Sequence, residues 1–151
     1  MFLNIHKQSP IQYNTIPWHW DWFSILNYPE GTRYTKIKHE NKKSIYNNLL
    51  HPRAGGIHTV LFSLGDQLNA LIDVTVVYPG HSSPRLFDFL IGNVKKIVVR
   101  VKIYKPGNNG MPSFETIRSK IGSGEVRKFL NELWKEKDLK IKKIQNEKNH
   151  F

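Results

Sequence analysis

The residues best suited to chemistry lie in a short loop that reads PEGTR, from Pro29 to Arg33. Arg33 offers a planar fork of donors that can bind a phosphate or carboxylate through two hydrogen bonds at once. Gly31 lets the backbone turn or approach a ligand closely. Glu30 has the wrong charge to bind an anion directly, so we expect it to hold Arg33 or the loop in place. The residue types in this loop predict an anion-binding site, and a phosphate group is the candidate ligand.

The element that must position this loop is the apolar run before it, Phe23 to Tyr28. Its composition is typical of a buried strand, and Pro29 cannot donate to a sheet ladder, so the strand should end there. Ligands of open α/β sheets bind outside the carboxyl ends of strands. The loop is therefore expected where such a sheet binds its ligand.

Arg53 is a second candidate anion contact. It precedes Gly55 and Gly56 at the predicted start of a helix, and a helix N-terminus attracts anions through its unpaired backbone N–H groups. The alternative, a plain helix-entry turn, stays open at this point.

Catalytic and metal-binding groups are not recognisable in the sequence. The chain contains no cysteine, which excludes a thiolate nucleophile, a disulfide framework and Cys-ligated zinc. The seven histidines are scattered without metal-ligand spacing, and we predict no metal site. Ser24 and Ser44 have no identifiable His and Asp arrangement around them, so a serine hydrolase is not supported. We predict no catalytic residue in this chain.

Two sequence words resemble the glycerolipid acyltransferases, the family that includes the 1-acylglycerol-3-phosphate acyltransferases. They are YPEGTR and VTVVYPG, and they occupy Tyr28 to Arg33 and Val74 to Gly80. The longer run YPEGTRYTKIKH, followed by LLHPRAGGI and DVTVVYPG, is especially similar to a bacterial branch of that family. The resemblance covers roughly residues 23–104. It implies that the second word lies near the acyl-donor pocket and that the phosphate of the acyl acceptor is bound by Pro29, Glu30, Gly31, Thr32 and Arg33.

The resemblance also implies what this chain lacks. In that family the base and its carboxylate partner come from an H-x-x-x-x-D word near the N-terminus, and no histidine here has an aspartate five positions later. The glycine-aromatic-arginine word of the family is absent too, because no glycine precedes Gly31. His19 and Asp21 could share one strand face, but their side chains would stand roughly 7 Å apart at a rise of ~3.3 Å per residue. We therefore expect the C-terminal half of an acyltransferase, inactive alone.

The fold class predicted from these patterns is α/β: a partial acyltransferase-type sheet flanked by helices, with a C-terminal amphipathic helix. We divide the chain into an irregular N-terminal segment (1–22), the C-terminal half of an acyltransferase-like domain (23–105), and a linker with a helical tail (106–151). A buried helix is predicted by the spacing of Ile57, Val60, Leu61 and Leu64 and should end near Gly65.

The apolar run Leu71 to Tyr78 predicts a strand covered on both faces, and a helix between two strands implies a right-handed βαβ crossover. Pro84 to Gly92 predicts a turn of helix. Lys96 to Lys105 alternates basic and apolar residues, which predicts a half-exposed strand. Its exposed side should carry Lys96, Arg100 and Lys102. The last helix, opened by Ser123, should pack on the domain through Val126, Phe129, Leu130, Leu133 and Trp134 and then fray.

The formal net charge of +11 favours anionic partners, which could be nucleic acid, acidic lipid headgroups or phosphorylated substrates. The resemblance implies a lysophospholipid and an acyl thioester, with acyl-CoA or acyl-carrier protein as co-substrate and no other cofactor. We expect an anionic membrane surface and a missing N-terminal half as further partners. No signal peptide and no membrane-spanning run are apparent, so we expect a peripheral protein on the cytoplasmic side of a membrane.

Two alternatives stay open. The charge also suits a small basic nucleic-acid-binding module, although the aromatic residues do not interleave with the basic strand as a base-stacking platform requires. A non-catalytic lipid-binding remnant is the other alternative.

Overall fold

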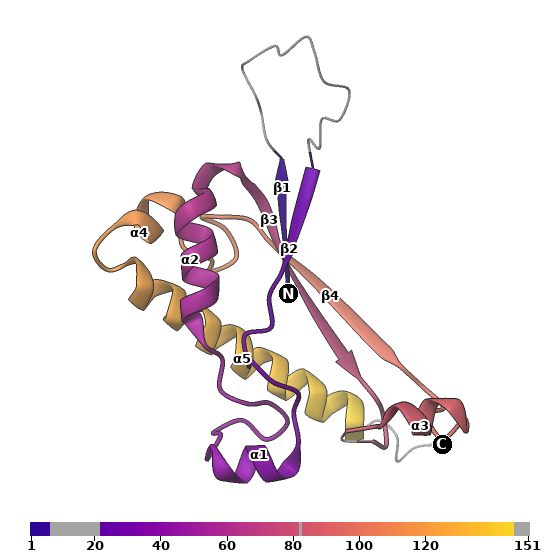
Figure 1. The fold of residues 1–151 in the computed structure, drawn as a ribbon. Helices are drawn as coiled ribbons and strands as arrows, with labels where there is room; N and C mark the ends of the chain where they lie inside the picture. The colour runs from indigo at the N-terminus through magenta and orange to yellow at the C-terminus, as the bar shows by residue number, and fades with distance from the viewer. Residues whose placement is uncertain (7–21, 82, 147–151) are drawn as a thin grey trace.

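The computed structural model describes residues 1–6, 22–81 and 83–146 of the chain. Within these residues, four strands form one sheet in the order β2-β1-β3-β4, and helices pack beside it (Figure 1). The strands are β1 (Phe2–His6), β2 (Trp22–Leu26), β3 (Leu68–Val77) and β4 (Val98–Tyr104). The helices are α1 (Lys36–Asn41), α2 (Ala54–Leu64), the 3₁₀ turn η1 (Gly65–Gln67), α3 (Leu86–Leu90), α4 (Phe114–Arg118) and α5 (Gly122–Asn146). The predicted α/β fold with a C-terminal helix is confirmed.

All three strand pairings are antiparallel. Because β1 lies antiparallel to both β2 and β3, those two strands run in the same direction, as the βαβ prediction requires, with β1 inserted between them. The prediction that residues 1–22 are irregular is wrong for Phe2–His6. Five residues are a weak local signal, and this strand exists because hydrogen-bonding partners flank it on both sides.

Helices α2 and α5 form the core against the sheet. The predicted α2 is confirmed: Ile57 and Leu61 are fully buried, and the helix ends at Leu64. The predicted apolar stripe of α5 is also buried, at Val126, Phe129, Leu130, Leu133 and Trp134. The short helices α1 and α4 were not expected, and each begins at a side-chain cap, from Thr35 and Ser113 respectively.

The end of α5 differs from the frayed tail that the sequence predicts. The helix continues to Asn146, and Ile141 is buried. Asp138 is also buried, and its carboxylate accepts hydrogen bonds from the backbone N–H groups of Asn47 at 3.0 Å and Asn48 at 2.7 Å. This long-range contact holds the last turns of α5 against the segment that follows α1.

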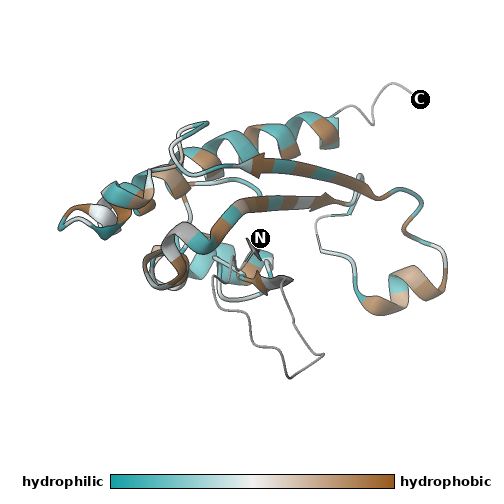
Figure 2. Cartoon of the chain, turned by 90° about the horizontal axis from the view of Figure 1, so that it is seen from above, coloured by the Kyte–Doolittle hydropathy of each residue, from teal (hydrophilic) through white to brown (hydrophobic). Residues whose placement is uncertain are grey.

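The two faces of the β3–β4 pair differ. Helix α5 runs along one face (Figure 2), where Lys102 reaches Glu136 at 2.8 Å and the Tyr104 ring packs edge-on against Phe129. The other face presents three apolar cross-strand pairs, Ile72 with Ile103, Val74 with Val101 and Val76 with Val99. Val76, Val99, Val101 and Ile103 are 44 to 59% exposed. We call these six residues the open apolar face.

Two predictions are therefore wrong. β3 is not covered on both faces, and the basic side of β4 is not its more exposed side. Lys102 is half-buried because Glu136 on α5 lies opposite it, whereas Val101 on the other side is exposed. The alternation of β4 is as predicted, but the long-range position of α5 decides which side faces the protein.

Candidate functional site

The PEGTR loop follows β2 directly. The strand ends at Leu26, before Pro29, as predicted. A turn then forms in which the Gly31 N–H donates to the Tyr28 carbonyl at 2.8 Å. Gly31 has a φ of +68°, a region that residues with a side chain rarely adopt. The glycine is therefore needed for the turn itself.

Arg53 contacts this loop. Its backbone N–H donates to the Pro29 carbonyl at 2.7 Å. Its side chain lies over the turn, because a β-carbon placed on Gly31 would lie 3.7 Å from Arg53 Nη1. The start of α2 and the PEGTR loop thus form one unit. The structure brings the second candidate anion contact to the PEGTR loop, although Arg53 lies 20 positions after Arg33 in the sequence.

Glu30 faces the protein body. Burial raises the pKa of the Glu30 carboxyl above its usual value, while hydrogen bonding to the backbone of Leu50 and to the Trp134 side chain offsets part of that rise. The Trp134 indole N–H also donates to the Leu50 carbonyl at 3.0 Å. These contacts favour a role in holding the loop, and no ion pair joins Glu30 to Arg33 within the described part of the chain.

Thr32 and Tyr34 attach the loop to its neighbours. Lys38 Nζ donates to Thr32 Oγ1 at 2.7 Å, which ties the loop to α1. The Tyr34 carbonyl accepts a hydrogen bond of 3.3 Å from Ser83 Oγ, which ties it to the segment after the second word. The segments that follow the two words are thereby linked.

Arg33 lines a cavity of about 400 Å³ that the two words share. Tyr78 comes from the second word, and its ring packs edge-on against Phe89 of α3 at 5.5 Å. The cavity joins one guanidinium to a wall that contains both apolar and polar side chains. Its lining comprises Arg33, Tyr34, Asn48, Leu49, Val76, Val77, Tyr78, His81, Ser83, Pro84, Leu86, Phe89, Ile141 and Gln145.

Of the predicted site residues, Arg33 alone is part of that lining. The other predicted residues shape the loop or lie against it: Pro29, Glu30, Gly31, Thr32 and Arg53. Ile141 and Gln145 were not expected in the site, because the end of α5 was predicted to fray. Leu86 and Phe89 were predicted only as part of a helical turn.

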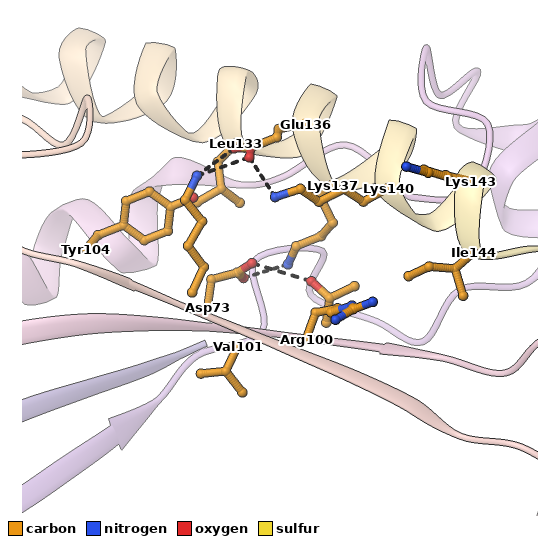
Figure 3. Close-up of a pocket in the computed structure, with 12 residues that line it drawn as sticks. Asp73, Arg100, Val101, Tyr104, Leu133, Glu136, Lys137, Lys140, Lys143 and Ile144 are labelled. Carbon is orange, nitrogen blue, oxygen red and sulfur yellow. Dashed lines mark hydrogen bonds and ion pairs between the residues drawn. The ribbon is translucent and has the colours of Figure 1, made fainter.

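A second cavity, of about 380 Å³, lies between the β3–β4 pair and α5 (Figure 3). Its charged groups largely pair with each other. Asp73 is buried and lies 2.6 Å from Lys137 Nζ, and Glu136 accepts from both Lys102 and Lys140. These pairs hold α5 to the sheet, and we assign this cavity no ligand.

Metal-binding groups do not gather in the part of the chain that the structure describes. No cluster of three or more histidine or acidic residues suited to a metal ion occurs there. His19 and Asp21, the pair considered as a substitute dyad, lie outside the described residues. No described helix is long and apolar enough to cross a bilayer.

Comparisons with curated proteins show similarity to lipid acyltransferases. The chain is 29% identical over 138 residues to 1-acyl-sn-glycerol-3-phosphate acyltransferase gamma of Homo sapiens and of Pongo abelii. It is 25% identical over 130 residues to lysocardiolipin acyltransferase 1 of Danio rerio. These alignments cover 86% and 80% of this chain, and they confirm the predicted resemblance to glycerolipid acyltransferases.

The same alignments cover 33% and 31% of the relatives. The chain thus spans about a third of the length of the curated proteins it matches. No family model matches the chain, and no solved structure matches it.

Proposed function

We propose that this chain is the acceptor-binding part of an acyltransferase. The enzyme would move a fatty acyl group from a thioester donor to a lysophospholipid such as 1-acylglycerol-3-phosphate. The relatives are named for acceptors of this kind, a 1-acylglycerol-3-phosphate and a lysocardiolipin. Both acceptors carry a phosphate group next to an acylated glycerol, so they present the same combination of charge and apolar chain.

The observation that carries this proposal is the composition of the shared cavity. Arg33 supplies a cation for the phosphate, and Val76, Leu86 and Phe89 supply apolar wall for an acyl chain. A charge-assisted hydrogen bond to phosphate contributes about 1.5–3 kcal/mol, and each buried methylene about 0.8 kcal/mol. A lysophosphatidate can use both terms, whereas a free phosphate or a neutral lipid uses only one.

Arg53 is the second phosphate contact in this proposal. It lies against the Gly31 turn and carries the same guanidinium group. The N-terminus of α2, which follows Arg53, adds backbone N–H groups that favour an anion. Glu30, Gly31 and Thr32 fix the loop that presents Arg33.

The chain alone is proposed to be inactive in acyl transfer. An acceptor hydroxyl that attacks a thioester must lose its proton to a base, and the developing oxyanion must be stabilised. The family's His and Asp word, which would supply that base, is absent from the sequence. We propose that the part of the relatives that this chain does not span supplies it, and that the open apolar face is where that part packs. Contiguous apolar surface of this kind typically marks an interaction site.

The co-substrate in this proposal is acyl-CoA or acyl-carrier protein, and the protein acts peripherally at the cytoplasmic side of a membrane. Nucleic-acid binding is less well supported. The basic strand that motivated it turns Lys102 toward Glu136, where the two form an ion pair, so this lysine is not presented to a phosphate backbone.

The test is equilibrium binding by titration calorimetry with short-chain ligands that stay monomeric in water. We expect the chain to bind 1-octanoylglycerol-3-phosphate at least tenfold more tightly than either glycerol-3-phosphate or 1-octanoylglycerol. Equal affinity for all three would contradict the proposal. Tighter binding to a single-stranded oligonucleotide, with affinity that falls steeply with salt, would favour the nucleic-acid-binding alternative instead.

A further inference from the structure

Helix α3 presents an unusually apolar surface. Four large apolar residues of α3 and its C-cap are 53 to 75% exposed: Leu86, Phe87, Leu90 and Ile91. They lie on a segment that projects from the end of the β3–β4 pair (Figure 1), and Figure 2 shows its hydrophobic colouring away from the core. We call these four residues the α3 tip. Contiguous exposed apolar groups of this size mark an interaction surface.

The α3 tip is held by defined contacts. Asp88 Oδ2 accepts from the backbone N–H of Arg85 at 2.6 Å, and the Asp88 carbonyl accepts from the N–H of Asn93 at 2.9 Å. Phe89 is less exposed, at 37%, and its ring packs edge-on against Tyr78. The same helix thus contributes Leu86 and Phe89 to the lining of the cavity that contains Arg33, and it also exposes the apolar side chains of the α3 tip.

Basic residues flank the α3 tip. Arg85 precedes it, and Lys95 and Lys96 follow it, and all three are exposed. The acidic residue within the helix, Asp88, is used by its capping bonds. An apolar segment with basic residues on both sides suits an anionic lipid surface, where apolar side chains enter the headgroup region and cations contact lipid phosphates.

We propose that the α3 tip docks this protein on an anionic bilayer surface. Leu86 lines the cavity that contains Arg33, so docking would place the mouth of that cavity at the lipid interface. The docking itself is argued from the surface of α3, whereas the placement of the cavity mouth at the lipid interface rests on the proposed function. A second copy of the chain is a poor occupant, because it would bring the same arginine and lysines against each other.

The chain has no cysteine, which allows a single labelling site. Leu90→Cys carries an environment-sensitive fluorophore, and Leu139→Cys on α5 is the matched control, since both residues are about 70% exposed. Each labelled protein is mixed with vesicles of phosphatidylcholine containing 30% phosphatidylglycerol and no lysophospholipid. We expect a blue shift, and quenching by brominated lipids, for the label at position 90 only. With vesicles of pure phosphatidylcholine, the blue shift of the label at position 90 should be at least fivefold smaller.

Vesicle sedimentation provides a second readout. Phe87→Ser should reduce partitioning at least tenfold, while Leu139→Ser should leave it unchanged, and circular dichroism checks that both variants fold. Equal effects of the two substitutions, or no lipid-dependent shift at position 90, would overturn the proposal. A blue shift that grows with protein concentration in the absence of vesicles would overturn it in favour of self-association.

Failure of this inference is distinguishable from failure of the proposed function. Arg33→Ala should still sediment with vesicles while it loses affinity for 1-octanoylglycerol-3-phosphate. If vesicle docking is absent but that ligand still binds through Arg33, only the docking proposal is wrong.

Discussion

The backbone N–H of Arg53 donates a 2.7 Å hydrogen bond to the carbonyl oxygen of Pro29. This bond joins the N-terminus of α2 to the loop that ends β2, and it places the Arg53 side chain over Gly31. Two arginines that are separated in the sequence therefore serve one loop.

Replacing Gly31 should weaken both stability and ligand binding. Gly31→Ala forces an alanine to a φ of +68°, which costs roughly 1–2 kcal/mol, and a relaxed turn would displace Arg53. The free energy of unfolding in urea should fall by about that amount. Gly124→Ala is the control, because Gly124 lies on α5 with open space around it, and its unfolding free energy should not decrease. Equal destabilisation by the two substitutions would contradict the strained turn.

Glu30 should make stability depend on pH. Burial raises its pKa above 4.5 in the folded protein, so the folded state holds this proton more tightly than the unfolded state does. The associated stabilisation is present below pH 4.5 and is lost as the pH rises through the folded pKa. The Glu30→Gln variant lacks this titrating group. Its melting temperature minus that of the wild type should therefore increase as the pH is raised from 4 to 7. A melting-temperature difference that stays constant across this pH range would refute the prediction.

The buried pair Asp73–Lys137 should be coupled. Its side chains are 8% and 10% exposed, so Lys137→Met leaves a carboxylate without its cation at a cost of roughly 3–5 kcal/mol. Asp73→Asn in the same background should recover a large part of that loss. Urea denaturation of the two single variants and the double variant measures the coupling. Additive effects would show that the pair does not act as a unit.

Local spacing is enough to predict α2, α3 and the apolar stripe of α5, because each follows from periodicity within one segment. It is not enough for β1, because the strands that pair with it, β2 and β3, lie in other parts of the sequence. Nor can it decide which side of β4 faces the protein, because Glu136, 34 residues from Lys102, determines that.

The site shows the same limit. The end of β2 before the loop and the turn at Gly31 are predictable from residue types, whereas the role of Arg33 in binding phosphate stays a prediction. The contribution of Ile141 to the site is not predictable from local patterns, because Asp138 attaches this part of α5 to the backbone of the segment after α1. A contact between residues 90 positions apart leaves no local pattern.

The absence of the family's base should be visible in an assay. Purified protein given acyl-CoA and 1-octanoylglycerol-3-phosphate should release no free thiol above the protein-free background, although it binds the acceptor. An intact lysophosphatidate acyltransferase in the same buffer provides the positive control. Thiol release that is lost in Arg33→Ala would mean that the chain contains its own base.

The central claim, that Arg33 binds the acceptor phosphate, is tested most directly by titration calorimetry of two arginine variants. Arg33→Ala should weaken binding of 1-octanoylglycerol-3-phosphate about 10- to 150-fold, the equivalent of ~1.5–3 kcal/mol, and leave 1-octanoylglycerol unaffected. Arg127→Ala removes the same charge from the exposed surface of α5 and should change neither affinity by more than about twofold. Equal losses in the two variants would reduce the effect to net charge and contradict the assignment.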